Sequence, residues 1–236
     1  MDKKLREDKK TIKLLFIGNS ATYVHDIPQT LASLAGKAGY PVEANAIAKG
    51  GYTISQHADS GSDHGKAVLD EIAKGYDIVF LQDNGNCISS EDMRSASKAA
   101  CGTLNAAIRA AGAETYIYVR PPYGKDSFGC TPFEQCVAFD KLFLEISKQL
   151  GTGNVYVNRA FAYAMNHLPY DLWGPDHAHI SEYGAYLAVC VFFSSLFHVS
   201  STVLDSNGLP LQDARALQQA ADKIVLDGHT FPECMK

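Results

Sequence analysis

The 236-residue sequence contains no long apolar run. Its first hydrophobic stretch, Ile12 to Ile17, follows a charged segment at positions 1–10. That stretch is far shorter than the ~20 apolar residues that a membrane-spanning helix needs. No signal-peptide pattern is visible either. We therefore expect no membrane partner and a cytoplasmic location.

Basic charge is also scarce. The chain has 21 Lys and Arg residues against 26 Asp and Glu residues, which gives a formal net charge of -5. A chain with this balance has no broad positive field that could hold a phosphate backbone. Nucleic acid is therefore not an expected partner.

Cysteine pairs of the CxxC type are absent. Six cysteines are scattered along the chain, and the spacing of Cys130 and Cys136 matches no zinc motif. A chain of this length needs no disulfide bonds to fold. We expect ordinary thiols, no bound metal and no cofactor.

The sequence does contain a regular alternation of short apolar runs and helical patterns. Strands are predicted at 12–17, 42–48, 77–81, 115–119 and 155–158. Helices are predicted from Pro28 to Gly39 and at 67–74, 91–111, 132–150 and 182–197. This alternation predicts an α/β fold, a three-layer α/β/α sandwich with a five-stranded, mainly parallel, flavodoxin-like sheet.

The pattern also predicts how the chain is divided. We expect a charged tail at 1–10 and a single domain over 11–236. The core of this domain would span about 12–198 and end with an amphipathic helix, followed by a C-terminal surface helix and extension at 199–236. Active sites of such sheets lie at the carboxyl ends of the strands.

Ser20 follows Gly18 and Asn19 at the end of the first predicted strand. Its hydroxyl would be exposed at the sheet edge, and its amide would lie at the N-terminal end of the next helix, where it could bind an oxyanion. Glycine, asparagine and serine also form ordinary turns. The motif alone is therefore compatible with a turn that has no function.

A second polar segment, Gly174-Pro-Asp-His-Ala-His179, precedes the last core helix. Within one turn, the Asp176 carboxylate could hold the Nδ1 atom of His179, which would make this histidine a general base. The same residues could instead form a polar loop that caps the next helix through Ser181.

Four blocks together resemble those of the SGNH/GDSL hydrolases, a superfamily of serine esterases and lipases whose blocks supply Ser, Gly, Asn and His in this order. The blocks are Phe16-Ile-Gly-Asn-Ser20, Lys49-Gly-Gly51-Tyr-Thr-Ile, Leu81-Gln-Asp-Asn84 and Asp176-His-Ala-His179. Asn19 stands where better-known members carry Asp, so the chain is similar to a subgroup with a Gly-Asn-Ser first block.

The resemblance implies a carboxylic ester hydrolase that forms an acyl-enzyme on Ser20, with His179 as the base and Asp176 as its orienting carboxylate. The oxyanion hole would consist of the amides of Ser20 and Gly51 and the side chain of Asn84. Neighbouring candidates for these donors are Gly50, Asn86 and Gln82.

The expected substrate is a short-chain ester, an acetyl ester on a carbohydrate or small molecule, because the sequence has no long apolar lid segment. Candidate substrate contacts are Asn19, Gln82, His57, Arg120 and Trp173.

Three other functions are compatible with the same residues. A carbohydrate-binding protein could keep the scaffold and stack sugars on Tyr52, Tyr123 and Trp173. An acyltransferase could use the same triad with a hydroxyl acceptor. A metal-dependent hydrolase would draw its ligands from Asp176, His177, His179, His57 and His64.

Overall fold

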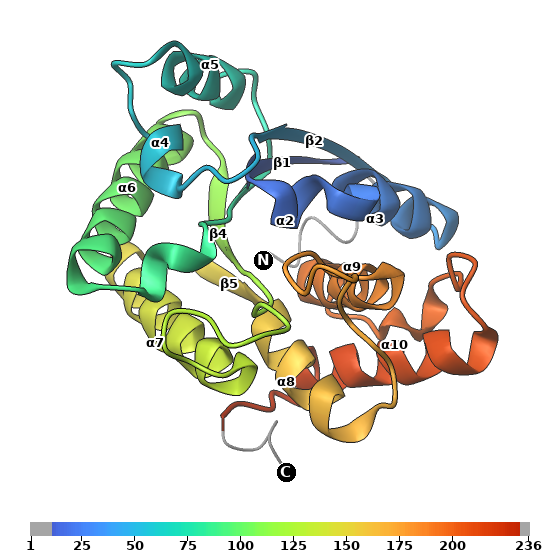
Figure 1. Ribbon diagram of the computed structural model, residues 1–236. Helices are drawn as coiled ribbons and strands as arrows, with labels where there is room; N and C mark the ends of the chain where they lie inside the picture. Colours follow the sequence, from blue (N-terminus) through green and yellow to red (C-terminus); the bar gives the residue numbers. More distant parts are fainter. Residues whose placement is uncertain (1–10, 232–236) are drawn as a thin grey trace.

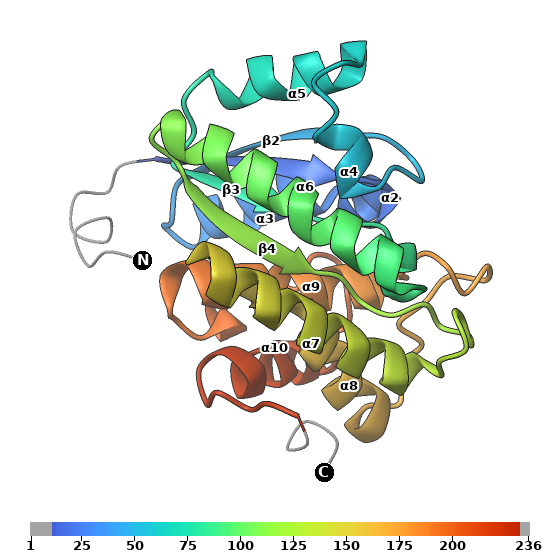
Figure 2. The same cartoon turned by 90° about the vertical axis from the view of Figure 1, so that its left-hand side faces the viewer.

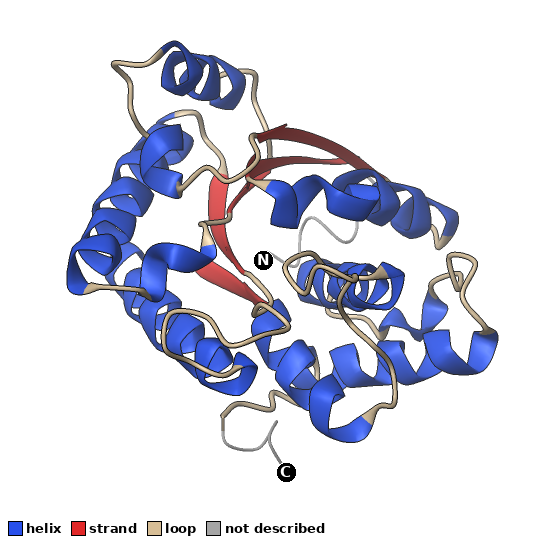
Figure 3. Cartoon of the chain, viewed as in Figure 1, coloured by secondary structure: helices blue, strands red, loops and turns tan. Residues whose placement is uncertain are grey.

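A single parallel sheet organises the chain. The computed structural model describes residues 11–231, so the charged segment 1–10 and Cys234 lie outside the described residues. Every neighbouring strand pair is parallel, and the order is β2-β1-β3-β4-β5. Figure 3 shows the strands in red with helices around them. The strands are β1 (Ile12–Gly18), β2 (Val42–Ala48), β3 (Ile78–Leu81), β4 (Glu114–Val119) and β5 (Gly153–Tyr156). This order is flavodoxin-like, and the predicted fold class is confirmed.

Helices connect the strands. The α-helices are α2 (Ser20–Tyr23), α3 (Ile27–Lys37), α4 (Ile54–His57), α5 (Asp63–Ile72), α6 (Glu91–Ala110), α7 (Pro132–Leu150), α8 (Val157–His167), α9 (Glu182–Phe197) and α10 (Leu211–Val225). Short 3-10 helices are η1 (Val24–Asp26), η2 (Gly85–Ile88) and η3 (Ser201–Val203). Helix α5 begins before the predicted residue 67 because the Ser62 side chain caps it by accepting a hydrogen bond from the Gly65 amide.

The helices form a layer on each face of the sheet (Figure 1). Successive side chains of a strand point to opposite faces. Leu14 and Phe16 of β1 therefore pack with α3, α8, α9 and α10, whereas Leu15 and Ile17 pack with α5, α6 and α7. Figure 2 shows α6 and α7 on the side of the sheet that faces the viewer.

Helix α9 differs from its prediction. The sequence pattern predicted an amphipathic helix, but most of α9 is buried. Phe192 packs on the sheet, with its ring centroid 5.3 Å from that of Phe16 and 5.1 Å from that of Phe80. The opposite side of α9 is covered by α10, whose Leu217 is fully buried. The prediction was wrong because a second helix, and not solvent, covers the outer side of α9.

The end of the sheet also differs from its prediction. We predicted a strand at 155–158, but β5 ends at Tyr156 and α8 begins at Val157. The Asn158 side chain is buried and donates a hydrogen bond to the Cys136 carbonyl at 3.0 Å. Asn158 therefore belongs to the first turn of α8 and not to the strand.

Two further features concern membrane-spanning helices and cysteine thiols. Within residues 11–231, no helix is both long enough and apolar enough to cross a bilayer. Four of the cysteines, Cys87, Cys101, Cys130 and Cys190, are free thiols.

Candidate active site

A cleft of about 380 Å³ lies at the carboxyl ends of the strands. Its lining comes from the segments that follow β1, β2, β3 and β4 and from the loop that precedes α9, which are far apart in the sequence. The lining residues are Asn19, Ser20, Ala21, Tyr23, Gly50, Gly51, Asn84, Arg120, Tyr123, Ala178 and His179. The cleft thus brings together Ser20, Gly51, Asn84 and His179, one residue from each of the four sequence blocks.

Ser20 begins α2 directly after β1. Its neighbour Asn19 is the N-cap residue, and the Asn19 Oδ1 atom accepts a hydrogen bond from the Ala21 amide at 3.1 Å. Gly18 is required by the tight packing here, because a Cβ atom at this position would lie 2.5 Å from both Gln82 Oε1 and Thr22 Oγ1. The Ser20 amide has no hydrogen-bond partner among residues 11–231. It remains available to a ligand in the cleft.

Asn19 connects the first two loops of the site. Its side chain is buried, and Nδ2 donates a hydrogen bond to the Tyr52 carbonyl at 2.9 Å. The Asn19 amide donates to Gln82 Oε1 at 2.9 Å. An aspartate at this position could accept the bond from Ala21, but it would face the Tyr52 carbonyl without a proton to donate. This explains in physical terms why asparagine fits the Gly-Asn-Ser block.

Gly51 and Asn84 hold each other in place. Gly51 has a φ of +74°, which favours glycine, and its carbonyl accepts a hydrogen bond from Asn84 Nδ2 at 2.9 Å. The second Nδ2 hydrogen of Asn84 remains for a ligand. The Gly51 amide has no hydrogen-bond partner within the described part of the chain. The cleft is lined by Asn84 but not by Asn86 or Gln82, whereas Gly50 and Gly51 both reach it.

The Asp83 carboxylate holds the backbone of the two loops that carry Gly51 and Asn84. Its side chain is buried, and Oδ1 accepts hydrogen bonds from the Ile54 amide at 2.8 Å and from the Asn84 amide at 2.7 Å. Burial raises the pKa of the Asp83 carboxyl. Asp83 was not among the predicted site residues, and its only signal in the sequence is an acidic residue two positions after a fully buried strand.

Asp176 and His179 form a short contact on the other side of the cleft. The His179 Nδ1 atom lies 2.6 Å from Asp176 Oδ2. Asp176 Oδ1 accepts hydrogen bonds from the His179 amide at 3.0 Å and from the Ala178 amide at 2.9 Å. The amide and side chain of His179, followed by the Ala178 amide, hold the pKa of Asp176 well below its ordinary value. With Nδ1 donating to a carboxylate, Nε2 of a neutral His179 is a proton acceptor.

The loop that carries this pair is closed at its base. Trp173 and Ile180 form an antiparallel bridge, and the Trp173 indole donates to the Pro122 carbonyl at 2.9 Å. The His177 carbonyl accepts a hydrogen bond from the Gly124 amide at 2.8 Å. His25, which follows α2, has its Nε2 atom 2.9 Å from the Ile180 carbonyl. The loop is therefore tied both to the segment that follows β4 and to the segment that follows α2.

Only some of the candidate substrate contacts line the cleft. Arg120 and Asn19 line the cleft, but Gln82, His57 and Trp173 are not among its lining residues. Gln82 is buried and accepts a hydrogen bond from Thr22 Oγ1 at 3.0 Å. The cleft also contains Tyr23, whose exposed fraction is 45% and which the sequence analysis missed. A tyrosine three positions after a serine carries no recognisable signal by itself.

His57 lies inside the protein and is paired with a second histidine. Its side chain is fully buried, and its Nδ1 atom lies 2.9 Å from His64 Nε2. Burial, and then the nearby charge of His64, lowers the pKa of His57 to about 4. Over residues 11–231, no three His, Cys, Asp or Glu side chains are arranged to hold a metal ion.

Comparison with known proteins identifies the fold. A putative SGNH hydrolase from Slackia heliotrinireducens superposes with a TM-score of 0.69 at 22% identity, covering 79% of this chain and 100% of that one. The chain has the SGNH hydrolase fold. A DUF4886 family protein from Bacteroides uniformis matches this fold with a TM-score of 0.79 at 18% identity, over 95% of this chain and 98% of that one.

An acetylxylan esterase from Geobacillus stearothermophilus also shares the SGNH fold. Its TM-score is 0.56 at 16% identity, and the match covers 77% of this chain and 92% of that one. No protein-family model matches the chain, and no curated protein matches it. These similarities concern the fold, so the chemistry of the cleft must be argued from its own residues.

Proposed function

We propose that the protein is a serine esterase with Ser20 as nucleophile, His179 as general base and Asp176 as the carboxylate that orients the base. The observation that carries this proposal is the 2.6 Å contact between His179 Nδ1 and Asp176 Oδ2, on a histidine that lines the same cleft as Ser20. Nucleophile, base and orienting group are the three parts that acyl transfer requires.

The proposed reaction starts when Ser20 Oγ attacks the ester carbonyl carbon and its proton passes to His179 Nε2. The negative charge on the former carbonyl oxygen is bound by the Ser20 and Gly51 amides and by Asn84 Nδ2. The tetrahedral intermediate collapses as His179 returns the proton to the leaving alcohol. Water, activated by His179, then hydrolyses the acyl-enzyme and releases the acid.

For the substrate, we propose a short-chain ester, such as an acetyl ester on a carbohydrate or small molecule. A cleft of about 380 Å³ that is rimmed by Tyr23 and Tyr123 suits a small ring better than a long acyl chain. The shared fold with an acetylxylan esterase is consistent with this substrate class.

A fluorophosphonate probe tests the reaction class. The purified protein is incubated with the probe, with and without EDTA, and the adduct is located by mass spectrometry. We expect a single adduct on Ser20 that is absent in Ser20→Ala and insensitive to EDTA. Ser95→Ala is the matched control, because Ser95 is exposed on α6 and alanine favours the helix. Labelling at another residue, or none, would exclude the proposed nucleophile.

The acyl chain is tested separately with 4-nitrophenyl esters of increasing length. We expect the acetate to be cleaved with the highest kcat/KM. Faster cleavage of long-chain esters would contradict the proposed substrate class and leave the nucleophile assignment intact.

A further inference from the structure

Arg120 is a buried cation at the floor of the cleft. It follows β4, has an exposed fraction of 4% and is one of the cleft-lining residues. Its guanidinium carbon lies 4.2 Å from the centroid of the Tyr123 ring, and its Nε atom donates a hydrogen bond to the Pro121 carbonyl at 3.0 Å. A Cβ atom at Gly85 would lie 2.5 Å from Arg120 Nη1, so glycine at this position leaves room for the guanidinium.

Most of the hydrogen-bonding capacity of Arg120 is unused. A guanidinium has five N–H groups, and the bond from Nε to Pro121 is its one hydrogen bond within residues 11–231. Neither Nη atom has a hydrogen-bond partner within residues 11–231, neither is fully enclosed, and the side chain is part of the cleft lining.

No carboxylate of the described residues lies within ion-pair distance of this guanidinium. Arg120 forms no ion pair within the described part of the chain, and none of the cleft-lining residues is acidic. Asp83 is the nearby buried acid, and the charge of Arg120 lowers the pKa of its carboxyl against the larger effect of burial. Its Oδ1 atom accepts hydrogen bonds from two amides, and it forms no ion pair with the guanidinium. A buried charge without a partner is unfavourable, so an anion that enters the cleft would be bound tightly.

We infer that Arg120 binds a carboxylate of the substrate, so that the preferred ester carries a carboxylate group on its acyl half or its alcohol half. This inference rests on the proposed esterase function and narrows its substrate class. The planar guanidinium matches a carboxylate through two parallel hydrogen bonds. A single arginine suits a singly charged group better than a phosphate dianion. An acetylated sugar acid would meet both this requirement and the proposed preference for short acyl chains.

Two matched pairs of esters test the inference and locate the charge. For the acyl half, mono-4-nitrophenyl succinate is compared with its neutral methyl ester. For the alcohol half, 4-carboxyphenyl acetate is compared with 4-carbamoylphenyl acetate. Rates with Ser20→Ala protein are subtracted, because a free carboxylate also accelerates spontaneous ester cleavage. The proteins compared are the wild type, Arg120→Gln, Arg120→Lys and the control Arg109→Gln, which removes one exposed positive charge from the end of α6.

We expect the wild type to prefer the carboxylate member of one pair by about tenfold or more in kcat/KM. This preference should disappear in Arg120→Gln, survive in part in Arg120→Lys and be unchanged in Arg109→Gln. Thermal unfolding and probe labelling of Ser20 confirm that each variant is folded.

Two results would overturn the inference. One is a wild type without preference in either pair, and the other is an Arg120→Gln variant that loses the same factor for charged and neutral esters. Either result leaves Ser20 labelling intact, whereas failure of the esterase proposal would abolish labelling and cleavage of all four esters.

Discussion

Two pairs of side chains, each joining an aspartate to a basic residue, have the same contact distance and different surroundings. His179 Nδ1 lies 2.6 Å from Asp176 Oδ2, and Arg159 Nε lies 2.6 Å from Asp140 Oδ1. The side chains of His179 and Asp176 are 42% and 52% exposed, whereas those of Arg159 and Asp140 are 10% and 13% exposed. A short distance alone therefore does not distinguish the proposed catalytic pair from a structural one.

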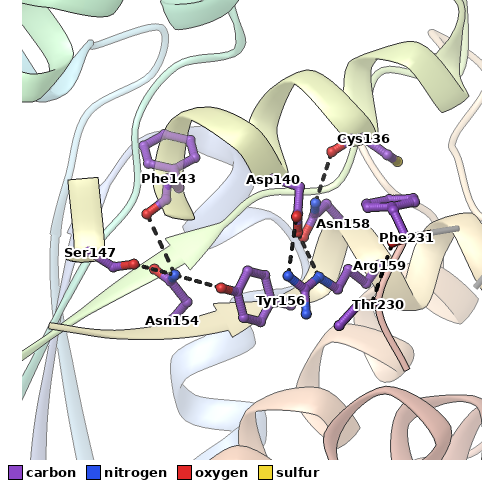
Figure 4. A network of polar contacts seen from close by, with 10 residues as sticks. All are labelled: Cys136, Asp140, Phe143, Ser147, Asn154, Tyr156, Asn158, Arg159, Thr230 and Phe231. Atoms are coloured by element: carbon purple, nitrogen blue, oxygen red, sulfur yellow. Dashed lines mark hydrogen bonds and ion pairs between the residues drawn. The ribbon is translucent and has the colours of Figure 1, made fainter. Parts of the chain in front are cut away.

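In the buried pair, both carboxylate oxygens accept hydrogen bonds from the guanidinium. Arg159 of α8 makes a second bond to Asp140 of α7, from Nη2 to Oδ2 at 3.1 Å, and its guanidinium carbon lies 3.5 Å from the Tyr156 ring centroid (Figure 4). It joins two helices. In the exposed pair, Nε2 of His179 is left to act on a ligand in the cleft. The two pairs therefore differ in exposure and in the availability of an acceptor atom, not in the length of their contact.

Removal of His179 should have the largest effect. We expect His179→Ala to lower kcat by about 10⁴- to 10⁶-fold, because the proton of Ser20 would lose its acceptor. The melting temperature should stay close to that of the wild type, since the imidazole is partly exposed. Steady-state kinetics and calorimetry check both. Near wild-type turnover would instead direct attention to the neighbouring His177.

Asp176→Asn should have the next largest effect, a decrease in kcat of about 10³- to 10⁴-fold, because an amide neither fixes the tautomer of His179 nor stabilises its cation. The pKa of Asp176 is held low by its hydrogen bonds, so this carboxylate stays ionised at ordinary assay pH. Loss of activity at mildly acidic pH should therefore not follow its titration. A variant with intact kcat would remove Asp176 from the mechanism.

Asp140→Ala should break the other pair and affect stability instead. It leaves the guanidinium of Arg159 buried without a partner, and we expect a loss of about 3–5 kcal/mol in the free energy of unfolding. Urea denaturation measures the loss. The double variant Asp140→Leu with Arg159→Met should recover much of it. Folded Asp140→Ala protein should keep its kcat, and a large decrease in kcat would show that the pair also shapes the site.

A third pair, His57 with His64, extends the comparison to the pH dependence of stability. The pKa of His57 is lowered to about 4 in the folded protein, whereas in the unfolded chain it would titrate near 6.5. Between these values the unfolded state binds more protons, so stability must decrease as pH falls from 6.5 towards 4. We expect His57 to contribute up to about 2–3 kcal/mol to this decrease. Urea midpoints at pH 7 and pH 4.5 should therefore converge in His57→Asn, and unchanged pH dependence would contradict the assignment.

Much of the sheet was predictable because buried parallel strands are short apolar runs that end in turn residues, as at Gly18 and Gly50. Ser20 could be placed because it follows a strand end at the sheet edge. His179 was singled out by its spacing from Asp176, and Asn84 by the resemblance of the four blocks to those of the SGNH hydrolases. Helix α8 was missed because its buried Asn158 and Arg159 have partners on α7, and the identity of such partners depends on packing. For the same reason the sequence did not distinguish Arg120, which lines the cleft, from His57, which is fully buried and does not line it.

Asp83 has a consequence for anyone who would redesign the protein. Its one carboxylate orients both the Ile54 amide, which follows the glycine loop, and the Asn84 amide. Loops tied to a common anchor move together, so neither can be replaced alone without misaligning the other. New specificity would be easier to select at Tyr23 and Tyr123, which border the cleft. The fold thus separates a base of the site, where one carboxylate fixes two loops, from a rim whose side chains can be exchanged independently.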